Sequence, residues 1–210
     1  MALSLEEEIQ LKINKEYEFY SREVKPLVDL IEVYFGAIPD AVLNEARNFI
    51  GHIASAATET TKAPVLRLQD IEAAHTHLRR ILLDCYKLMC IHQQDYIKKF
   101  KKEFKYFNIS DVDDGNFLIN LRKYSNDADE AFKVAKRADN TGKNPRTPEE
   151  LGEVYEKYCI AYNTYTNAVD YINDHFDGVL RVAHKHFFGK VISVLGWLIG
   201  IVLAILSLSN

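Results

Sequence analysis

Residues 151–179 read LGEVYEKYCIAYNTYTNAVDYINDHFDGV, and an apolar or aromatic side chain recurs there every three or four positions. Because an α-helix turns once in about 3.6 residues, this spacing places those side chains along one face of a helix. The TPEE segment at 147–150 combines an N-cap threonine, a proline and a glutamate, which favours a helix start. The recurring positions are Leu151, Tyr155, Tyr158, Tyr162, Tyr165, Val169, Ile172, Phe176 and Val179. We therefore predict a long helix with a tyrosine seam formed by Tyr155, Tyr158, Tyr162 and Tyr165.

The same register continues into residues 191–208, which read VISVLGWLIGIVLAILSL and carry no charge. Eighteen residues at about 1.5 Å each are just enough to cross a hydrocarbon core of about 30 Å. Basic residues precede this stretch at Arg181, Lys185 and Lys190 and none follows it, so the positive-inside rule keeps the body in the cytoplasm. We expect a cytosolic helical bundle over residues 1–186 and a C-terminal transmembrane tail anchor over residues 187–210. The alternative is a buried C-terminal helix of a soluble protein.

Small residues follow one stripe of the expected membrane helix. In lipid, such a stripe allows two helix backbones to approach closely and gain dispersion contacts. The stripe contains Gly189, Ser193, Gly196, Gly200, Ala204 and Ser207. We expect these positions to mediate self-association in the membrane, so that the bilayer and further copies of the chain are the partners.

The rest of the chain predicts an all-α fold, a bundle of about five helices with two long rods. Ser4 and Glu7 form a capping box before the first helix, which Pro26 should kink or break near Lys25. Further helices are expected at about 40–57, 66–107 and 116–138, and the last rod begins at about residue 148. Without a proline between 149 and 210, this last rod could run for about 90 Å and continue through the bilayer.

Composition narrows the functional classes. The chain has 210 residues, of which 48% are hydrophobic, and a net charge of −4, which argues against the nucleic-acid backbone as the main partner. Cys85, Cys90 and Cys159 form no C-x-x-C pair, and the acidic segment 110–116 departs from a calcium loop at Gly115 and Asn116. We therefore expect no cofactor, no metal and no small-molecule substrate.

Arg47, Asn48 and His52 lie close together in the sequence RNFIGH. This pattern resembles the R-x4-6-H signature of the HEPN superfamily, helical bundles many of which cut RNA as dimers. With the expected tail anchor it looks like the divergent membrane-bound HEPN proteins that accompany RNA-targeting CRISPR systems. The resemblance implies a metal-independent endoribonuclease in which Arg47 stabilises phosphoryl charge, His52 acts as acid or base, and Asn48 orients them. The alternative is that Arg47 pairs with a glutamate and His52 is a residue at the edge of the core.

Two further clusters are polar. In HTHLRR, His75 and Arg79 share a helix face and His77 points away, and His75 fits a hydrogen-bonded residue near the core. In YIKKFKKEFKYF, a basic patch surrounds four aromatic residues and could contact an anionic leaflet or RNA. The alternative is a solvated helix end whose apolar edge packs in the bundle. The basic patch consists of Lys98, Lys99, Lys101, Lys102 and Lys105.

These patterns predict a tail-anchored oligomeric effector that forms a pore or perturbs the membrane, and the HEPN resemblance implies a role in prokaryotic antiviral defence. The sequence contains no nucleophile elbow, Walker loop or dinucleotide fingerprint. We therefore expect that the chain is not an enzyme, unless Arg47 and His52 form a catalytic pair. Two alternatives stay open: a membrane-tethered HEPN-type ribonuclease, for which RNA or an RNA-guided effector would be the partner, and a structural membrane tether or scaffold.

Overall fold

The protein is all-helical in the computed structural model described here. The structure describes the backbone of residues 4–107, 109, 111–141 and 148–208 and the side chains of residues 4–107, 109, 111–140 and 150–185. Within these ranges no strand occurs, which confirms the predicted all-α class. The described elements are α1 (Leu5–Phe19), the π-helical turn η1 (Tyr20–Val24), α2 (Lys25–Phe35), α3 (Asp40–Thr58), α4 (Pro64–Glu103), the 3-10 turn η2 (Val112–Gly115), α5 (Phe117–Thr141) and α6 (Pro148–Leu208).

The first rod runs from α1 through η1 into α2 without leaving the helical conformation. Its start is the predicted capping box, because the Glu7 amide donates to Ser4 Oγ and the Glu7 carboxylate accepts from the Ser4 amide. Near Lys25 the expected interruption takes the form of a π-helical turn, in which the Lys25 amide donates to the Tyr20 carbonyl. Because Pro26 has no amide hydrogen and clashes with the preceding turn, this wider turn lets the helix continue past it.

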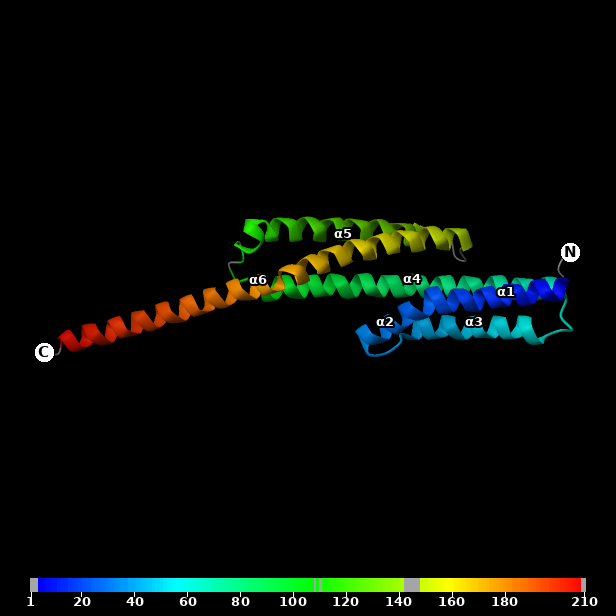
Figure 1. Cartoon of the computed structure of the whole chain (residues 1–210), viewed down its shortest axis with the longest axis horizontal. Helices are drawn as coiled ribbons and strands as arrows, with labels where there is room; N and C mark the ends of the chain where they lie inside the picture. The colour runs from blue at the N-terminus through cyan, green and yellow to red at the C-terminus, as the bar shows by residue number, and fades with distance from the viewer. Residues whose placement is uncertain (1–3, 108, 110, 142–147, 209–210) are drawn as a thin grey trace.

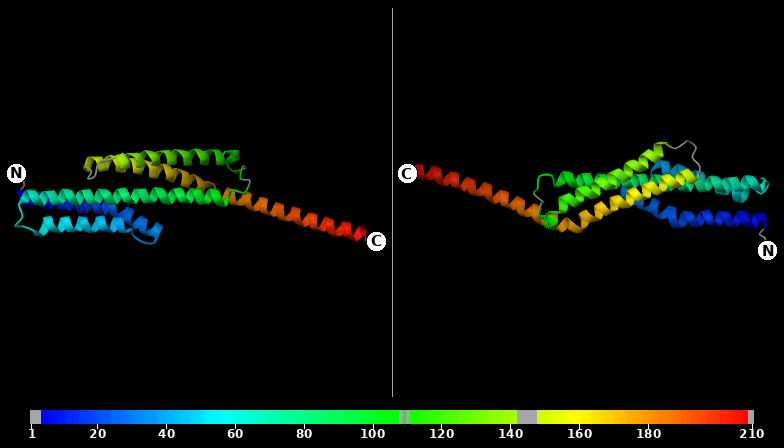
Figure 2. Two further views of the ribbon diagram at one scale, coloured as in Figure 1. Left: turned by 180° about the vertical axis from the view of Figure 1, so that it is seen from behind. Right: turned by 90° about the horizontal axis from the view of Figure 1, so that it is seen from above.

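The forty-residue helix α4 is the spine of the molecule (Figure 1). Helices α1, α2 and α3 lie along its N-terminal half, whereas α5 and α6 lie along its C-terminal half, and both views in Figure 2 agree. Each half has a core of its own. Ile13, Phe49 and Leu78 are buried in the first core, and Phe117 and Ile172 are buried in the second. The predicted range of this rod was wrong at its end, since α4 stops at Glu103 and Phe104 turns into the second core.

The tyrosine seam of α6 packs inside this bundle. Tyr155 and Tyr162 meet the ring of Tyr86 on α4 edge-to-face, with ring centroids 5.4 Å and 5.5 Å apart. Tyr158 and Tyr165 meet Phe132 on α5 in the same manner. The seam is thus shared between two neighbouring helices, and the buried face of α6 is wider than predicted. It also includes Val154, Ala161 and Ala168.

Beyond Ala183, the last buried residue described on α6, the helix continues away from the bundle to Leu208 (Figure 1). The predicted transmembrane segment 187–210, with Gly189, Ser193, Gly196, Gly200, Ala204 and Ser207, lies outside the residues whose side chains are described. Within the residues whose side chains are described, no helix is long and apolar enough to span a membrane.

Candidate acid–base site between α3 and α4

The three residues that carry the HEPN resemblance all lie on α3, but the structure does not bring them together. Arg47 and Asn48 are exposed, whereas His52 is half-buried and turned toward α4. Five positions on a helix correspond to a rotation of about 140°, so Arg47 and His52 occupy different faces. Arg47 forms no ion pair with any described carboxylate, so the predicted pairing with a glutamate is not found among the described residues.

His52 instead faces a second histidine, His77 on α4. The two imidazole rings stack with their centroids 5.3 Å apart and their planes 19° apart. His52 Nδ1 lies 3.2 Å from Asp70 Oδ1 on α4, and His77 Nδ1 lies 2.5 Å from Glu45 Oε2 on α3. Each histidine therefore bonds a carboxylate of the opposite helix. We call His52 and His77 the imidazole pair.

Asp70 is held by more groups than His52. Lys62 Nζ donates to Asp70 Oδ2 at 2.6 Å, and Ser55 Oγ donates to the same oxygen at 2.8 Å. Burial raises the pKa of Asp70, but the hydrogen bonds from Lys62, Ser55 and His52 outweigh it and bring the pKa below its ordinary value. A charged carboxylate can only accept, so we assign a proton to His52 Nδ1.

An imidazole backed by a carboxylate is a common way to position a proton-transfer group. The His52 side chain is 37% exposed and within reach of a ligand, whereas that of His77 is 13% exposed and held against the protein. Arg80 adds positive charge, with its Nη1 3.9 Å from Glu45 Oε2. Among the described side chains, no three His, Cys, Asp or Glu residues lie close enough together to hold a metal ion.

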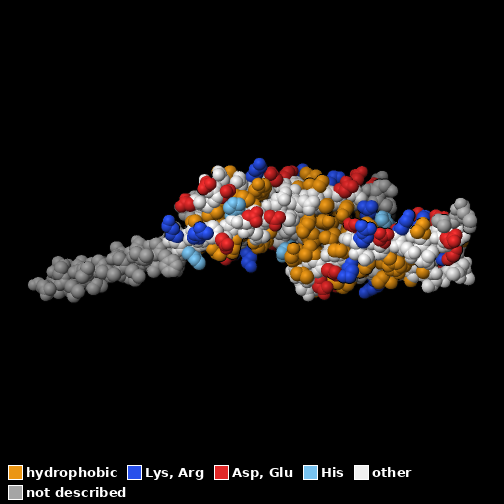
Figure 3. All heavy atoms as spheres, viewed as in Figure 1, with side chains coloured by type: hydrophobic (Ala, Val, Ile, Leu, Met, Phe, Trp, Pro, Cys, Tyr) orange, Lys and Arg blue, Asp and Glu red, His pale blue; other side chains and the backbone are white. Residues whose placement is uncertain are grey.

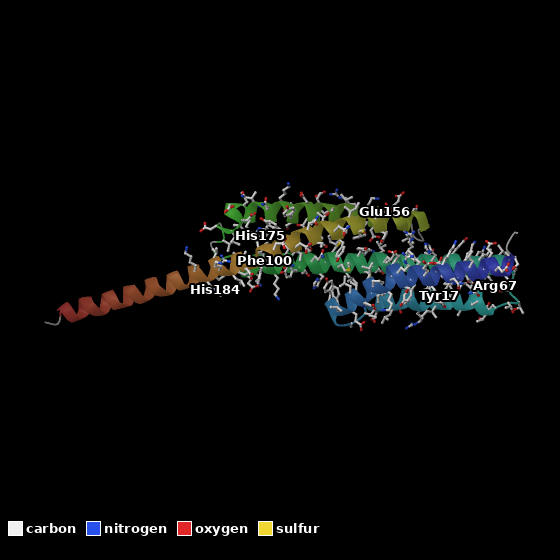
Figure 4. All side chains as sticks on the ribbon, in the orientation of Figure 1. Tyr17, Arg67, Phe100, Glu156, His175 and His184 are labelled. Atoms are coloured by element: carbon white, nitrogen blue, oxygen red, sulfur yellow. The ribbon has the colours of Figure 1, made fainter. Side chains whose placement is uncertain are left out.

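The cluster at His75 and Arg79 faces a different part of the molecule. His75 Nδ1 lies 2.9 Å from Glu16 Oε2, and Arg79 Nε donates to His75 Nε2 at 3.2 Å. His75 is therefore hydrogen-bonded, as predicted. These residues line a groove of about 920 Å³ between α1, α4 and the start of α6, where Glu156 is labelled in Figure 4. Cations and carboxylates both line the groove, so its charge favours neither an anionic nor a cationic ligand. Its lining includes Lys12, Lys15, Glu72 and Glu153.

The basic patch does not form a surface of alternating lysines and aromatics. Phe100 and Phe104 are buried in the second core, so the apolar edge packs in the bundle. Lys101 donates to Ser125 Oγ on α5, and burial lowers its pKa. Lys98 pairs with Asp95, whereas Lys99, Lys102 and Lys105 are exposed without an ion pair to a described residue, and Lys105 lies over the ring of Tyr106. On the face shown in Figure 3, basic and acidic side chains are interspersed at the end from which α6 emerges.

Sequence reasoning missed the partners of His52 and one buried cation. Asp70, His77 and Glu45 become neighbours of His52 only through the pairing of α3 with α4, which no local spacing reveals. Arg67, near the start of α4 in Figure 4, is 3% exposed and donates to the Ala56 carbonyl and to both carboxylate oxygens of Glu6. Its position four residues before Ile71 on the buried face could have indicated this.

Comparison of the chain with protein-family models, curated proteins and solved structures finds no match.

Proposed function

We propose that the protein is a tail-anchored, oligomeric membrane effector whose helical bundle stands in the cytoplasm. The observation that carries this proposal is the continuity of α6, a helix of 61 residues. Its first part is fixed between α4 and α5, and its last part leaves the bundle with the uncharged sequence of residues 191–208. From Ala183 to Val191 is only about 12 Å along a helix, so the bundle would lie close to the lipid headgroups.

A continuous helix gives the bundle a mechanical connection to the bilayer. Because the seam of α6 is buried against α4 and α5, a rearrangement of these helices would rotate or tilt the segment beyond them. Clustering along the stripe from Gly189 to Ser207 would then bring several such segments together. Membrane perturbation fits such a cluster better than a wide aqueous channel, since no side chain within residues 191–208 is more polar than serine. A role in prokaryotic antiviral defence is part of the proposal and depends on the HEPN resemblance.

Replacing Gly196 and Gly200 together by leucine tests the clustering. We expect the double variant to insert into lipid vesicles but to lose most of the dye release caused by the unaltered chain, because leucines keep the backbones apart. The matched control replaces Val194 and Val202 by leucine on the opposite face of the helix. Equal dye release from the glycine variant and the control would contradict the proposal.

The second candidate function is a membrane-tethered ribonuclease. It is favoured by one observation, the orientation of His52 by a charged Asp70 beside a second imidazole. The expected result is cleavage of single-stranded RNA by the full chain in detergent and its loss in His52→Ala. The third expectation, a tether that recruits a partner helix along the tyrosine seam, is disfavoured because that seam is occupied by Tyr86 and Phe132.

A further inference from the structure

A groove of about 590 Å³ lies between the last turns of α4 and the first turns of α5. Lys101 and Arg122 line it from the two helices, and neither forms an ion pair with a described residue. Burial lowers the pKa of Lys101, Asp129 partly offsets this, and nearby Arg122 lowers it further. The rest of the lining is aliphatic and consists of Leu118, Ile119 and Leu121. We call this the cationic groove, and its described lining contains no carboxylate.

Helix α6 carries exposed carboxylates at the same end of the bundle. We call them the acidic face, which consists of Asp170, Asp174 and Asp177. Spacings of four and three residues place these side chains on one side of the helix. All three are exposed, and none forms an ion pair with a described residue. Because like charges at these spacings repel one another, a cation supplied from outside would stabilise the acidic face.

The cationic groove and the acidic face lie at the same level along the bundle. The Phe117 ring at the start of α5 stacks on Tyr171 of α6 with centroids 5.5 Å apart. One to two turns further along α5, Tyr124 meets the same ring at 5.1 Å. The groove residues on α5, between Phe117 and Tyr124, are therefore level with the part of α6 that carries the acidic face.

The two surfaces point in opposite directions. Ala168 and Ile172 are buried where α6 packs in the second core. Asp170 and Asp174 each follow one of these residues by two positions, a rotation of about 200°, so they point away from α4 and α5. The cationic groove is lined by α4 and α5 alone among the described residues, so it opens on the side of these helices that α6 does not cover.

We propose that the acidic face of one copy docks into the cationic groove of the next copy and so joins the cytosolic bundles of the oligomer side by side. This inference rests on the proposed function, under which α6 of every copy enters one membrane in the same direction. Parallel copies bring surfaces of equal level together, so the groove and the face meet without a shift along the helix axis. Opposite charges then pair between copies, and the neighbouring helix covers Leu118 and Ile119, which are 49% and 67% exposed in one copy.

The contact is heterologous, because it joins two different surfaces of the chain. Such contacts continue from copy to copy, and they close into a ring when the rotation between neighbours permits. A ring of bundles holds the segments beyond Ala183 next to one another at the membrane. Contacts along the stripe from Gly189 to Ser207 then add to the association within the lipid.

Charge exchange tests the contact in the full chain in detergent, with oligomer size measured by light scattering over a dilution series. We expect Arg122→Glu and Asp174→Arg each to raise the dissociation constant of the oligomer by about tenfold or more, because like charges then face each other. A chain with both changes should associate nearly as the unaltered chain does, since the pair is restored between copies. The matched control is Lys123→Glu, which reverses an exposed charge beside Arg122 outside the groove lining.

An unchanged dissociation constant in Arg122→Glu would overturn the contact. A loss of association that Asp174→Arg does not reverse would also overturn it, and would assign the cationic groove to another anionic occupant such as lipid headgroups.

A crosslink measures the geometry of the contact. In a chain with Cys159→Ser, where Cys85 and Cys90 are buried, Ile119→Cys and Asp174→Cys together should give a ladder of disulfide-linked species on oxidation. Either change alone should leave the chain uncrosslinked. The control pairs Ile119→Cys with Asn163→Cys, an exposed position on the same side of α6 about 16 Å from Asp174 along the helix.

A ladder from the control pair, or crosslinking by Ile119→Cys alone, would contradict the proposed geometry. An oligomer that forms without a ladder from the Ile119 and Asp174 pair would overturn the contact while the membrane proposal stands. A full chain that is monomeric in detergent would remove both.

Discussion

Asp113 and Asp114 in η2 adopt left-handed backbone conformations, with φ of 53° and 50°. Residues other than glycine rarely adopt this conformation. Contacts of Asp113 compensate for this conformation, since Tyr171 on α6 donates its hydroxyl to Asp113 Oδ2 at 2.7 Å and Asn120 donates at 3.3 Å. Burial, followed by the bond to Asp113, raises the pKa of Tyr171 to about 12. One acidic turn thus joins the start of α5 to α6 shortly before α6 leaves the bundle.

This contact predicts a pH dependence of stability. The hydrogen bond from Tyr171 holds the pKa of Asp113 below its ordinary value of 3.8. A depressed pKa contributes stability that is fully present above the ordinary value and is lost as the pH falls through the folded-state value. The unaltered chain should therefore be more stable to urea than Asp113→Asn at about pH 6, and the difference should shrink toward about pH 3. Asparagine tolerates the left-handed conformation, so a difference that is independent of pH would contradict this account.

The three cysteines predict a difference in reactivity. Burial raises the pKa of Cys85 and of Cys90 to about 12, and only a thiolate attacks a maleimide. Cys159 is only half-buried on α6. We expect maleimide to label Cys159 alone in the folded chain and all three cysteines in denaturant, as read by mass spectrometry. Labelling of Cys85 or Cys90 under native conditions would show that the core around α4 opens readily.

At the scale of the helix, α6 is the element whose packing departs most from expectation. The tyrosine pattern predicted one seam, but α6 lies between two helices and buries a second row that includes Ala161 and Ala168. Alanine carries little hydrophobic signal, so the periodicity of large side chains could not reveal this row. The starts of α1 and α3 were predicted from local capping and turn chemistry. The meeting of His52 with His77 depends on how the consecutive helices α3 and α4 pack against each other, which local spacing does not show.

This packing predicts the effect of enlarging a buried alanine. Ala168 is fully buried in the second core, so Ala168→Leu should overpack the contact and lower the free energy of unfolding by about 1–3 kcal/mol. The control is Ala57→Leu at an exposed position of α3, where a change below about 0.5 kcal/mol is expected. Chemical denaturation monitored by circular dichroism measures both. Equal stability of the two variants would mean that the row is not close-packed.

At the scale of the whole molecule, α4 contributes to two cores along its length, Tyr86 and Tyr162 pack against both cores, and α6 projects from one end (Figure 1). The imidazole pair belongs to the half built by α3 and α4, and the projecting helix belongs to the other half. The two functional proposals therefore concern separate parts of the chain and can fail separately. Variants of His52 should leave membrane association unchanged, and removal of residues 187–210 should leave the contact between α3 and α4 intact.

The membrane proposal depends most directly on where the chain resides after alkaline extraction. Membranes from cells expressing the full chain are washed with sodium carbonate, beside membranes from cells expressing residues 1–186. The account predicts that the full chain stays in the membrane pellet and is released only by detergent, while the shortened chain appears in the supernatant. Release of the full chain by carbonate alone would contradict the account.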